Sequence, residues 1–239
     1  MRLRQSALNN QILTLLEPAD FEALAAHLEP VDLPKSYVVA EAEKPITHYY
    51  FLESGIGSIV GRSPEGLKAE VGLVGRDGIM PTAAILGCDS IVHDITVQVA
   101  GHGYRIEAAQ FKKVLGSNSG LHAVLLRFVQ VLSTQSASTA LSNAVHHVEE
   151  RLARWLLMCH DRVDGNQIAL THEYISIMLA VRRPSVTTAL HVLEGNRFIH
   201  STRGLVTIRD REGLKAFAAD AYGIPEAEYG RLLGPLHKH

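Results

Sequence analysis

The hydrophobic pattern of this chain changes its period along the sequence, and this change limits the folds open to it. Between about residues 31 and 106, short β-prone runs such as HYYFL and ITVQV alternate with turn residues. Turns are expected at residues 53–55 (ESG) and 101–103 (GHG), among others. Before and after this region, apolar residues recur at helical spacing. Many short strands with regularly spaced turns predict an antiparallel roll, barrel or sandwich, so we expect an α+β protein.

The composition indicates a folded protein but does not decide what the protein binds. The 239 residues suffice for one large domain or two smaller ones, and a hydrophobic fraction of 46% suffices for a packed core. The formal net charge is -2, whereas a surface that binds nucleic acid is usually basic. A sum over the whole chain can hide a basic patch, so this charge neither supports nor excludes DNA binding.

The two cysteines, Cys88 and Cys159, lie far apart in the sequence and share no short motif. A secreted scaffold held by disulfides would need more of them. The N-terminal segment has only a short apolar run, unlike a signal peptide, and no stretch reaches the roughly 18 uninterrupted apolar residues of a membrane span. We therefore expect a soluble, cytoplasmic protein with no membrane partner.

A long helix is predicted between about residues 120 and 144, and its apolar residues form a stripe. The predicted dimer seam consists of Leu121, Leu125, Phe128, Leu132, Gln135 and Thr139. Its first four members are spaced by 4, 3 and 4 residues, which is the repeat of paired helices. The stripe becomes polar or small towards its C-terminal end. A single amphipathic helix packed on its own domain would give the same stripe, and the pattern alone leaves this alternative open.

A second strong helix is predicted at residues 146–163. Leu152, Trp155 and Leu156 share one of its faces, and the turn residues 164–166 (DGN) end it. The break between the two long helices places a domain boundary near Val145.

The segment between Thr171 and Glu194 has the pattern of two short helices joined by a tight turn. Thr171 is a suitable N-cap for the first helix, which should end near Ala180. Pro184 fits the first turn of the second helix, where its missing N–H costs little, and residues 195–196 (GN) would end that helix. This arrangement is typical of the helix-turn-helix motif, whose second helix enters the major groove of DNA.

Polar side chains gather where the second helix begins. Arg182 and Arg183 lie there, and an arginine can contact guanine through two hydrogen bonds, while small hydroxyl side chains can reach phosphates or base edges. Between Thr171 and Gly204 there are four arginines and two glutamates, so the local charge is +2. The candidate DNA-binding residues are Thr171, His172, Arg182, Arg183, Ser185, Thr187, Thr188, Thr202 and Arg203.

Two short strands are predicted after the motif, at residues 197–200 and 205–208, around a turn at 201–204. They would form a hairpin, or wing, that brings Arg203 near the DNA backbone. The alternative is an ordinary helical hairpin whose arginines are only solvated. The presence of a wing next to the two helices favours the DNA-binding interpretation.

The order of a β-rich domain, a long helix and a winged helix-turn-helix resembles that of the CRP/FNR family of bacterial transcription regulators. The most specific stretches are VEERLARWLL (148–157), the helix-turn-helix and RGLVTIRDREGL (203–214). The resemblance implies a cyclic-nucleotide-binding-like β-roll, a dimerisation helix and a C-terminal winged helix-turn-helix. It also implies a homodimer on a two-fold-symmetric operator in double-stranded DNA.

This resemblance divides the chain into four parts. A β-roll sensor domain with N-terminal helices would occupy residues 1–118 and the dimerisation helix residues 119–145. The DNA-binding domain would follow at 146–222, and residues 223–239 would form a C-terminal tail. RNA polymerase is a further expected partner if the protein activates transcription.

The resemblance also assigns roles to individual residues. Arg183 matches a base-reading arginine of the family. Pro184 falls where well-known members have a base-reading glutamate, and Thr188 falls where they have another arginine, so the operator should differ from theirs. Thr171 matches a position that contacts phosphate, and the wing residues 202–203 do likewise.

The sensor region departs from the cyclic-nucleotide site of this family. Such a site has a Gly-Glu pair for the ribose and an Arg-Ser pair for the cyclic phosphate. The corresponding stretches here are residues 75–78 (GRDG) and 90–95 (SIVHDI). No arginine stands near His93 to pair with the phosphate, and Asp94 would repel it, so a cyclic nucleotide is not expected.

The residues assign no other effector or cofactor. An iron–sulfur cluster needs about four cysteines, and the chain has two. His48, His93 and His102 are candidate haem ligands, but none has a diagnostic spacing. We therefore assign no cofactor and no metal site.

The sequence as a whole predicts a DNA-binding transcription regulator, with gating by an unidentified effector in the β-roll left open. The alternative is a ligand-binding signalling module whose helix-turn-helix contacts protein rather than DNA. An enzyme is not expected, because the chain lacks a convincing nucleophile–base set or a metal cluster at cupin-like spacing.

Overall fold

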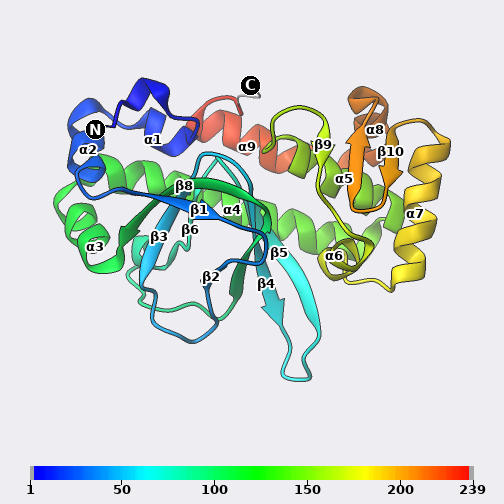
Figure 1. Cartoon of the computed structure of the whole chain (residues 1–239), viewed down its shortest axis with the longest axis horizontal. Coiled ribbons are helices and arrows are strands. Elements are labelled where there is room, and N and C mark those ends of the chain that lie inside the picture. The colour runs from blue at the N-terminus through cyan, green and yellow to red at the C-terminus, as the bar shows by residue number, and fades with distance from the viewer. Residues whose placement is uncertain (1–2, 237–239) are drawn as a thin grey trace.

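A computed structural model of the chain describes residues 3–236 and consists of a β-roll, a long central helix and a helical head (Figure 1). The helix α4 spans Ser119–Val145, runs along one side of the β-roll and leads to the head, which comprises residues 148–221. This mixed architecture confirms the predicted fold class. Among the described residues, no helix combines the length and the apolar character that crossing a membrane requires.

The β-roll is built from two antiparallel sheets of four strands each. One sheet has the strand order β1-β8-β3-β6 and the other the order β2-β7-β4-β5, so β5 forms an edge. The strands are β1 (Glu29–Leu33), β2 (Val38–Ala40), β3 (His48–Leu52), β4 (Ile56–Arg62), β5 (Lys68–Val74), β6 (Ile79–Met80), β7 (Asp94–Val99) and β8 (Gly101–Glu107). Buried residues of both sheets form one core with the N-terminal helices and α4.

The predicted turn at residues 101–103 is wrong, because these residues begin strand β8, which lies between β1 and β3. The two glycines are explained by close packing. A Cβ on Gly101 would come within 2.1 Å of the Ser54 carbonyl oxygen, and one on Gly103 within 2.2 Å of the Phe51 carbonyl oxygen. Glycine is therefore required here by the approach of a neighbouring backbone, not by a turn.

Short helices cover the end of the β-roll where the chain begins. The helices of this lobe are η1 (Gln5–Ala7), α1 (Gln11–Leu15), α2 (Pro18–Ala25), η2 (Ala83–Leu86) and α3 (Ala108–Ser117). Pro18 occupies the first turn of α2, where a proline is well tolerated. The Asn10 side chain caps α1 and also donates to the carbonyls of Leu52 and Gly78, which fixes this helix to the β-roll.

The head has its own apolar core around α5. Its elements are α5 (Val148–His160), β9 (Gln167–Ile168), α6 (His172–Met178), α7 (Arg183–Gly195), β10 (Ile199–Thr202), β11 (Leu205–Ile208), α8 (Arg211–Ala218) and η3 (Ala219–Ala221). The core of the head also includes Ile56, Val60 and Leu73 from strands β4 and β5. The head is therefore packed directly against the β-roll as well as joined to it through α4.

The segment 223–239, predicted as a tail, contains the helix α9 (Ile224–Leu233), and residues 237–239 lie outside the described part of the chain. The Glu226 side chain accepts a hydrogen bond of 3.0 Å from the Gly223 backbone N–H at the start of α9. Tyr229 and Leu233 are buried in the same core as the β-roll. In Figure 1, α9 lies beside α4, and these two helices are in extensive contact. The last part of the chain therefore returns to the β-roll.

Candidate nucleic-acid interface

The helices α6 and α7 form the predicted helix-turn-helix. The Thr171 hydroxyl accepts a hydrogen bond of 3.3 Å from the Tyr174 backbone N–H and so caps α6. The helix ends at Met178, and Ala180 adopts a positive φ of 50° in the turn. Arg183 and Pro184 then form the first turn of α7. The two helices thus follow the local signals in the sequence closely.

One side of α7 is buried and the other carries the polar residues. Val186, Ala189, Leu190 and Leu193 are buried in the core of the head. Arg182, Arg183 and Thr188 are exposed, whereas Ser185 and Thr187 are half-buried. The N-terminal half of α7 therefore presents two cationic side chains and hydroxyl groups to solvent, at the end of the helix that favours anions.

Contacts between side chains hold the N-terminal ends of α6 and α7 together. The Arg183 guanidinium lies 2.9 Å from the Glu173 carboxylate, and both side chains are about two-thirds exposed (62% and 66%). The Thr187 hydroxyl lies 3.3 Å from Nδ1 of His172. The structure thus brings His172, Arg183 and Thr187 into one cluster. An ion pair as exposed as this one is weak, so Arg183 can exchange Glu173 for another partner at little cost.

The wing follows α7 as the antiparallel pair β10 and β11, with Arg203 and Gly204 in the connecting turn. Gly204 has a φ of 80°, which suits glycine at a tight hairpin turn. The backbone N–H of Leu170, just before the α6 cap, donates a hydrogen bond of 2.9 Å to the Gly204 carbonyl. Thr202 and Arg203 are exposed. The tip of the wing is therefore adjacent to the start of α6, on the side of Thr171.

A contact that the sequence did not predict joins α6 to the β-roll. Tyr174 is half-buried, and its side chain hydrogen-bonds to that of Thr96, while burial raises the pKa of the Tyr174 hydroxyl. Nζ of Lys35 lies 5.5 Å from the centre of the Tyr174 ring. Helix α6 also contacts strand β5. The helix-turn-helix is thus attached to the β-roll through the helix that precedes α7.

A buried polar cluster forms a second connection between the lobes. The Arg162 guanidinium donates a hydrogen bond of 2.6 Å to the Asp77 carboxylate, and the Tyr229 hydroxyl donates one of 3.0 Å to the Asp77 carbonyl. Gly75 allows the approach, because a Cβ there would lie 2.8 Å from Cβ of Arg162. The segment 72–78 therefore lies at the contact between the β-roll and the head. No local signal in the sequence indicated this role.

The predicted dimer seam faces the β-roll of the same chain. Leu121, Leu125, Phe128 and Gln135 are buried in it, and Leu132 and Thr139 are partly buried. The Gln135 side chain accepts a hydrogen bond of 2.7 Å from the Leu73 N–H and donates one of 3.2 Å to the Leu73 carbonyl. The polar end of the seam has intrachain partners: Gln135 pairs with backbone groups of the edge strand β5, and the Thr139 hydroxyl accepts a hydrogen bond of 3.1 Å from Arg154 in α5. The seam assignment is corrected accordingly: this stripe is the intrachain face of α4.

The candidate haem ligands lie in unrelated surroundings. Nδ1 of His48 is 3.1 Å from the Thr47 hydroxyl, and Nδ1 of His102 is 2.9 Å from the Ser54 hydroxyl. His93 lies at a cavity between the β-roll and α4. Within residues 3–236 there is no group of three or more histidine, cysteine, aspartate or glutamate side chains that could hold a metal ion.

The helix-turn-helix is also recognisable by comparison with known proteins. Residues 150–217 match the family model described as the Crp-like helix-turn-helix domain, which spans α5 to α8. A search of curated proteins finds no match to the chain. The architecture defined by the fold and this domain is that of a winged helix-turn-helix regulator with an N-terminal β-roll.

Several solved structures share this architecture. The c-di-GMP responsive global regulator CLP from Xanthomonas campestris is 14% identical, with a TM-score of 0.64, over 80% of this chain and 99% of CLP. FixK2 from Bradyrhizobium japonicum is 15% identical, with a TM-score of 0.67, over 80% of this chain and 98% of FixK2. A CRP-family transcriptional regulator from Thermus thermophilus is 17% identical, with a TM-score of 0.66, over 81% and 99% of the two chains. At these identities the likeness concerns the fold.

The chain therefore carries a Crp-like helix-turn-helix domain within the fold of CRP/FNR-type transcription regulators. The resemblance drawn from the sequence is confirmed at this level.

Proposed function

We propose that the protein binds DNA in a sequence-specific manner and regulates transcription, with the N-terminal half of α7 in the major groove. The observation that carries this proposal is the position of Arg183. It lies exposed in the first turn of α7, just before Val186, the first buried residue of the helix, within the domain that matches the Crp-like family. An arginine in this place can take guanine through two hydrogen bonds.

The remaining candidate residues supply the positioning contacts. On DNA, Arg183 leaves Glu173 for a base, and Arg182 and Thr188 lie beside it at the groove. Thr171 and His172 at the start of α6 reach one stretch of backbone phosphates, and the wing residues 202–203 reach another. Phosphate contacts fix the register of the protein, while base contacts decide the sequence.

The proposal includes a homodimer, formed through the face of α4 that points away from the β-roll. The exposed face carries Ala123, Leu126, Gln130, Ser133, Ala137, Ala140 and Ala144. These positions alternate in spacing between 3 and 4 residues, which is the repeat of a helix pair, and most are small enough for close approach. Leu126 and Leu141, which are 43% and 56% exposed, add apolar surface along the same helix. A second copy covers this face and creates the two-fold symmetry that a symmetric operator requires.

The β-roll controls the position of the reading helix in this proposal. The contact of α6 with β5 and the burial of Tyr174 support this role, because any movement of β5 changes the surface on which α6 rests. An effector that alters β5 or α4 then shifts the population of heads able to bind DNA. We also expect cytoplasmic localisation, and RNA polymerase as a partner if the regulator activates.

A band-shift experiment with DNA from upstream of the protein's own gene tests the proposal. We expect a specific complex, and Arg183→Ala should weaken it by about ten- to a hundredfold, as expected for loss of a two-bond contact to a base. Arg231→Ala is the matched control, because Arg231 is as exposed as Arg183 and also pairs with a glutamate, Glu228, but lies in α9 and not in the helix-turn-helix. Unchanged binding by Arg183→Ala, or an equal loss in both variants, would contradict the assigned role.

The salt dependence of the affinity separates DNA binding from the alternative of a head that contacts protein. Each phosphate contact releases counterions, so the affinity for DNA should fall steeply as salt is raised. A flat dependence, or no binding to any DNA at low salt, would favour the signalling module.

A further inference from the structure

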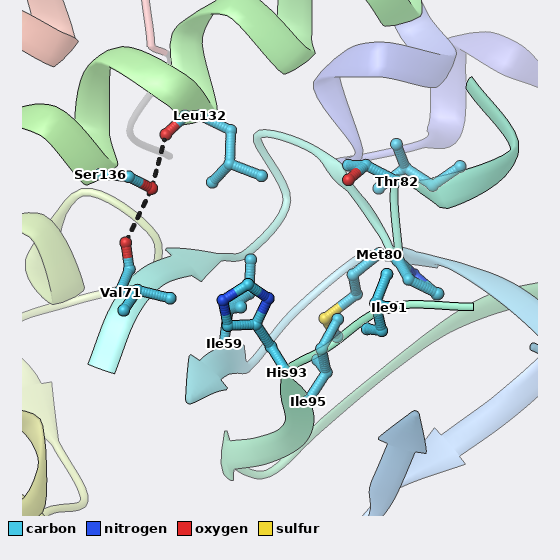
Figure 2. A pocket seen from close by; sticks show the side chains of 11 residues that line it. Ile59, Val71, Met80, Thr82, Ile91, His93, Ile95, Leu132 and Ser136 are labelled. Carbon is cyan, nitrogen blue, oxygen red and sulfur yellow. Dashed lines mark hydrogen bonds between the residues drawn. The ribbon is translucent and has the colours of Figure 1, made fainter. Parts of the chain in front are cut away.

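A cavity of about 290 Å³ lies between the inner side of the β-roll and helix α4. Aliphatic side chains form most of its wall. Ile59, Val71 and Ile95 come from strands β4, β5 and β7, and Leu132 approaches from α4 (Figure 2). Ile79 and Met80 of strand β6 also line it, so the cavity is bounded by strands of both sheets and by the helix that leads to the head.

Few polar groups reach the cavity, and two of them are free. The Ser136 hydroxyl is already engaged, since it lies 2.8 Å from the Val71 carbonyl and 3.1 Å from that of Leu132 (Figure 2). The imidazole of His93 and the hydroxyl of Thr82 also line the cavity. Neither of these side chains has a hydrogen-bond partner within the described residues. They are available to a bound molecule.

Among the described residues, no charged side chain lines the cavity. The nearby Asp94 is held by Arg62 and by the Ala42 backbone N–H. Arg76 points away and pairs with Asp164 at a distance of 2.8 Å. A phosphate or carboxylate in this cavity would therefore lose its hydration without gaining a fixed cation, which is costly. The chemistry of the wall favours an uncharged ligand.

We propose that this cavity binds an uncharged, largely apolar molecule of about two fused rings, held by one hydrogen bond to His93 or Thr82. The size follows from the volume, because an apolar cavity of roughly 150 Å³ accommodates one benzene ring, and this one is about twice as large. Burial of the apolar rings supplies the affinity, and the single polar contact fixes the orientation.

The position of β5 connects this cavity to the head. Val71 faces the cavity, while the preceding residue, Glu70, points the other way and accepts a hydrogen bond of 2.7 Å from the Trp155 indole in α5. The same strand contacts α6. A ligand that displaces Val71 or Leu132 therefore acts on both contacts at once. This regulatory consequence rests on the proposed DNA-binding function, whereas binding of the ligand does not.

The binding step can be tested on the full chain in the absence of DNA. Indole is the probe, since it is uncharged, has two fused rings and carries one N–H donor. We expect calorimetric titration to detect indole binding and no binding of cyclic AMP at the same concentrations. Ile91→Phe places a larger side chain in the wall and should weaken indole binding by about tenfold or more. Val92→Phe is the matched control, because Val92 is 69% exposed and does not line the cavity.

Circular dichroism establishes whether each variant is folded, and Ile59→Phe, which fills the cavity from β4, replaces Ile91→Phe if that variant does not fold. Failure of indole to bind the unmodified chain up to its solubility limit overturns the proposal. Equal indole binding by the cavity-filling and control variants, or preferential binding of cyclic AMP, also overturns it. Loss of DNA binding alone would contradict the proposed function and leave the ligand site standing.

Discussion

The Arg162 guanidinium donates a hydrogen bond of 2.6 Å to the Asp77 carboxylate, and this ion pair joins the helical head to the β-roll. The two side chains are only 4% and 2% exposed. Burial alone would lower the pKa of Arg162, but the adjacent Asp77 carboxylate raises it above its ordinary value. Arg162 therefore stays charged, and its charge depends on Asp77 for compensation.

Removal of this compensation should destabilise the folded chain strongly. We expect Asp77→Asn to lower the free energy of unfolding by about 3–5 kcal/mol, because a buried guanidinium loses the carboxylate to which it is hydrogen-bonded. Urea denaturation followed by circular dichroism measures the change. Asp89→Asn is the control, since Asp89 forms an exposed pair with Lys112 and should cost less than about 1 kcal/mol. Similar effects of the two substitutions would show that the lobes do not depend on the buried pair.

Glu70 predicts a pH dependence of stability. It is buried on strand β5, and burial raises its pKa to about 7, although hydrogen bonds from Ser58 and Trp155 oppose this change. The unfolded chain has the ordinary pKa of 4.5. The folded state therefore binds more protons than the unfolded state between pH 4.5 and 7. Stability from this group is fully present below pH 4.5 and is lost as the pH rises through about 7.

Glu70→Gln should remove this part of the pH dependence. The amide is neutral at every pH and still accepts from the Trp155 indole. Relative to the variant, the unmodified chain should lose on the order of 3 kcal/mol of unfolding free energy between pH 4.5 and 8. Urea denaturation at a series of pH values measures both chains. Parallel curves for the two proteins over this range would show that Glu70 is ionised in the folded state at all of these pH values.

The sequence predicts the helix-turn-helix well because its signals are local. A cap at Thr171, a proline at the start of α7 and the spacing of the buried residues each act within one or two helical turns. The long helix is different. An apolar stripe indicates that one face of a helix is buried. It does not indicate whether that face packs against a second copy of the chain or against another part of the same chain. The stripe from Leu121 to Thr139 is covered by the β-roll.

The contacts between the lobes could not be predicted for a related reason. Asp77 and Arg162 are separated by 85 positions, and Asp77 and Tyr229 by 152. Each residue alone is typical of a surface or a turn. The fold of the whole chain, including the packing of α9 on the β-roll, brings these distant residues into contact. The same holds for Gly101. Glycine is typical of turns, but this one lies in a strand and is required there by the close approach of the Ser54 backbone.

The pairing of Glu173 with Arg183 predicts that Glu173 competes with DNA for Arg183, the residue proposed to contact a base. Glu173→Gln removes the counter-charge from Arg183 and a negative charge from the expected DNA surface. The affinity for operator DNA should rise by about two- to fivefold, the scale of an exposed ion pair. A fluorescence-anisotropy titration at fixed salt measures it. Glu228→Gln, which frees Arg231 on α9, is the control and should leave the affinity unchanged. An unchanged or lower affinity of Glu173→Gln would place Glu173 outside the interface.

The exposed face of α4 predicts the oligomeric state. Ala137 lies at its centre, so Ala137→Glu brings two like charges together across a helix pair and should convert a dimer into monomers. Light scattering after size-exclusion chromatography measures the mass in solution. Ala23→Glu makes the same substitution at an exposed position of α2 and should leave the dimer intact.

Substitution in the intrachain stripe, as in Leu125→Glu, should instead unfold the β-roll, because that residue is fully buried. If Ala137→Glu remained dimeric while Leu125→Glu became a folded monomer, the assignment of the two faces would be reversed.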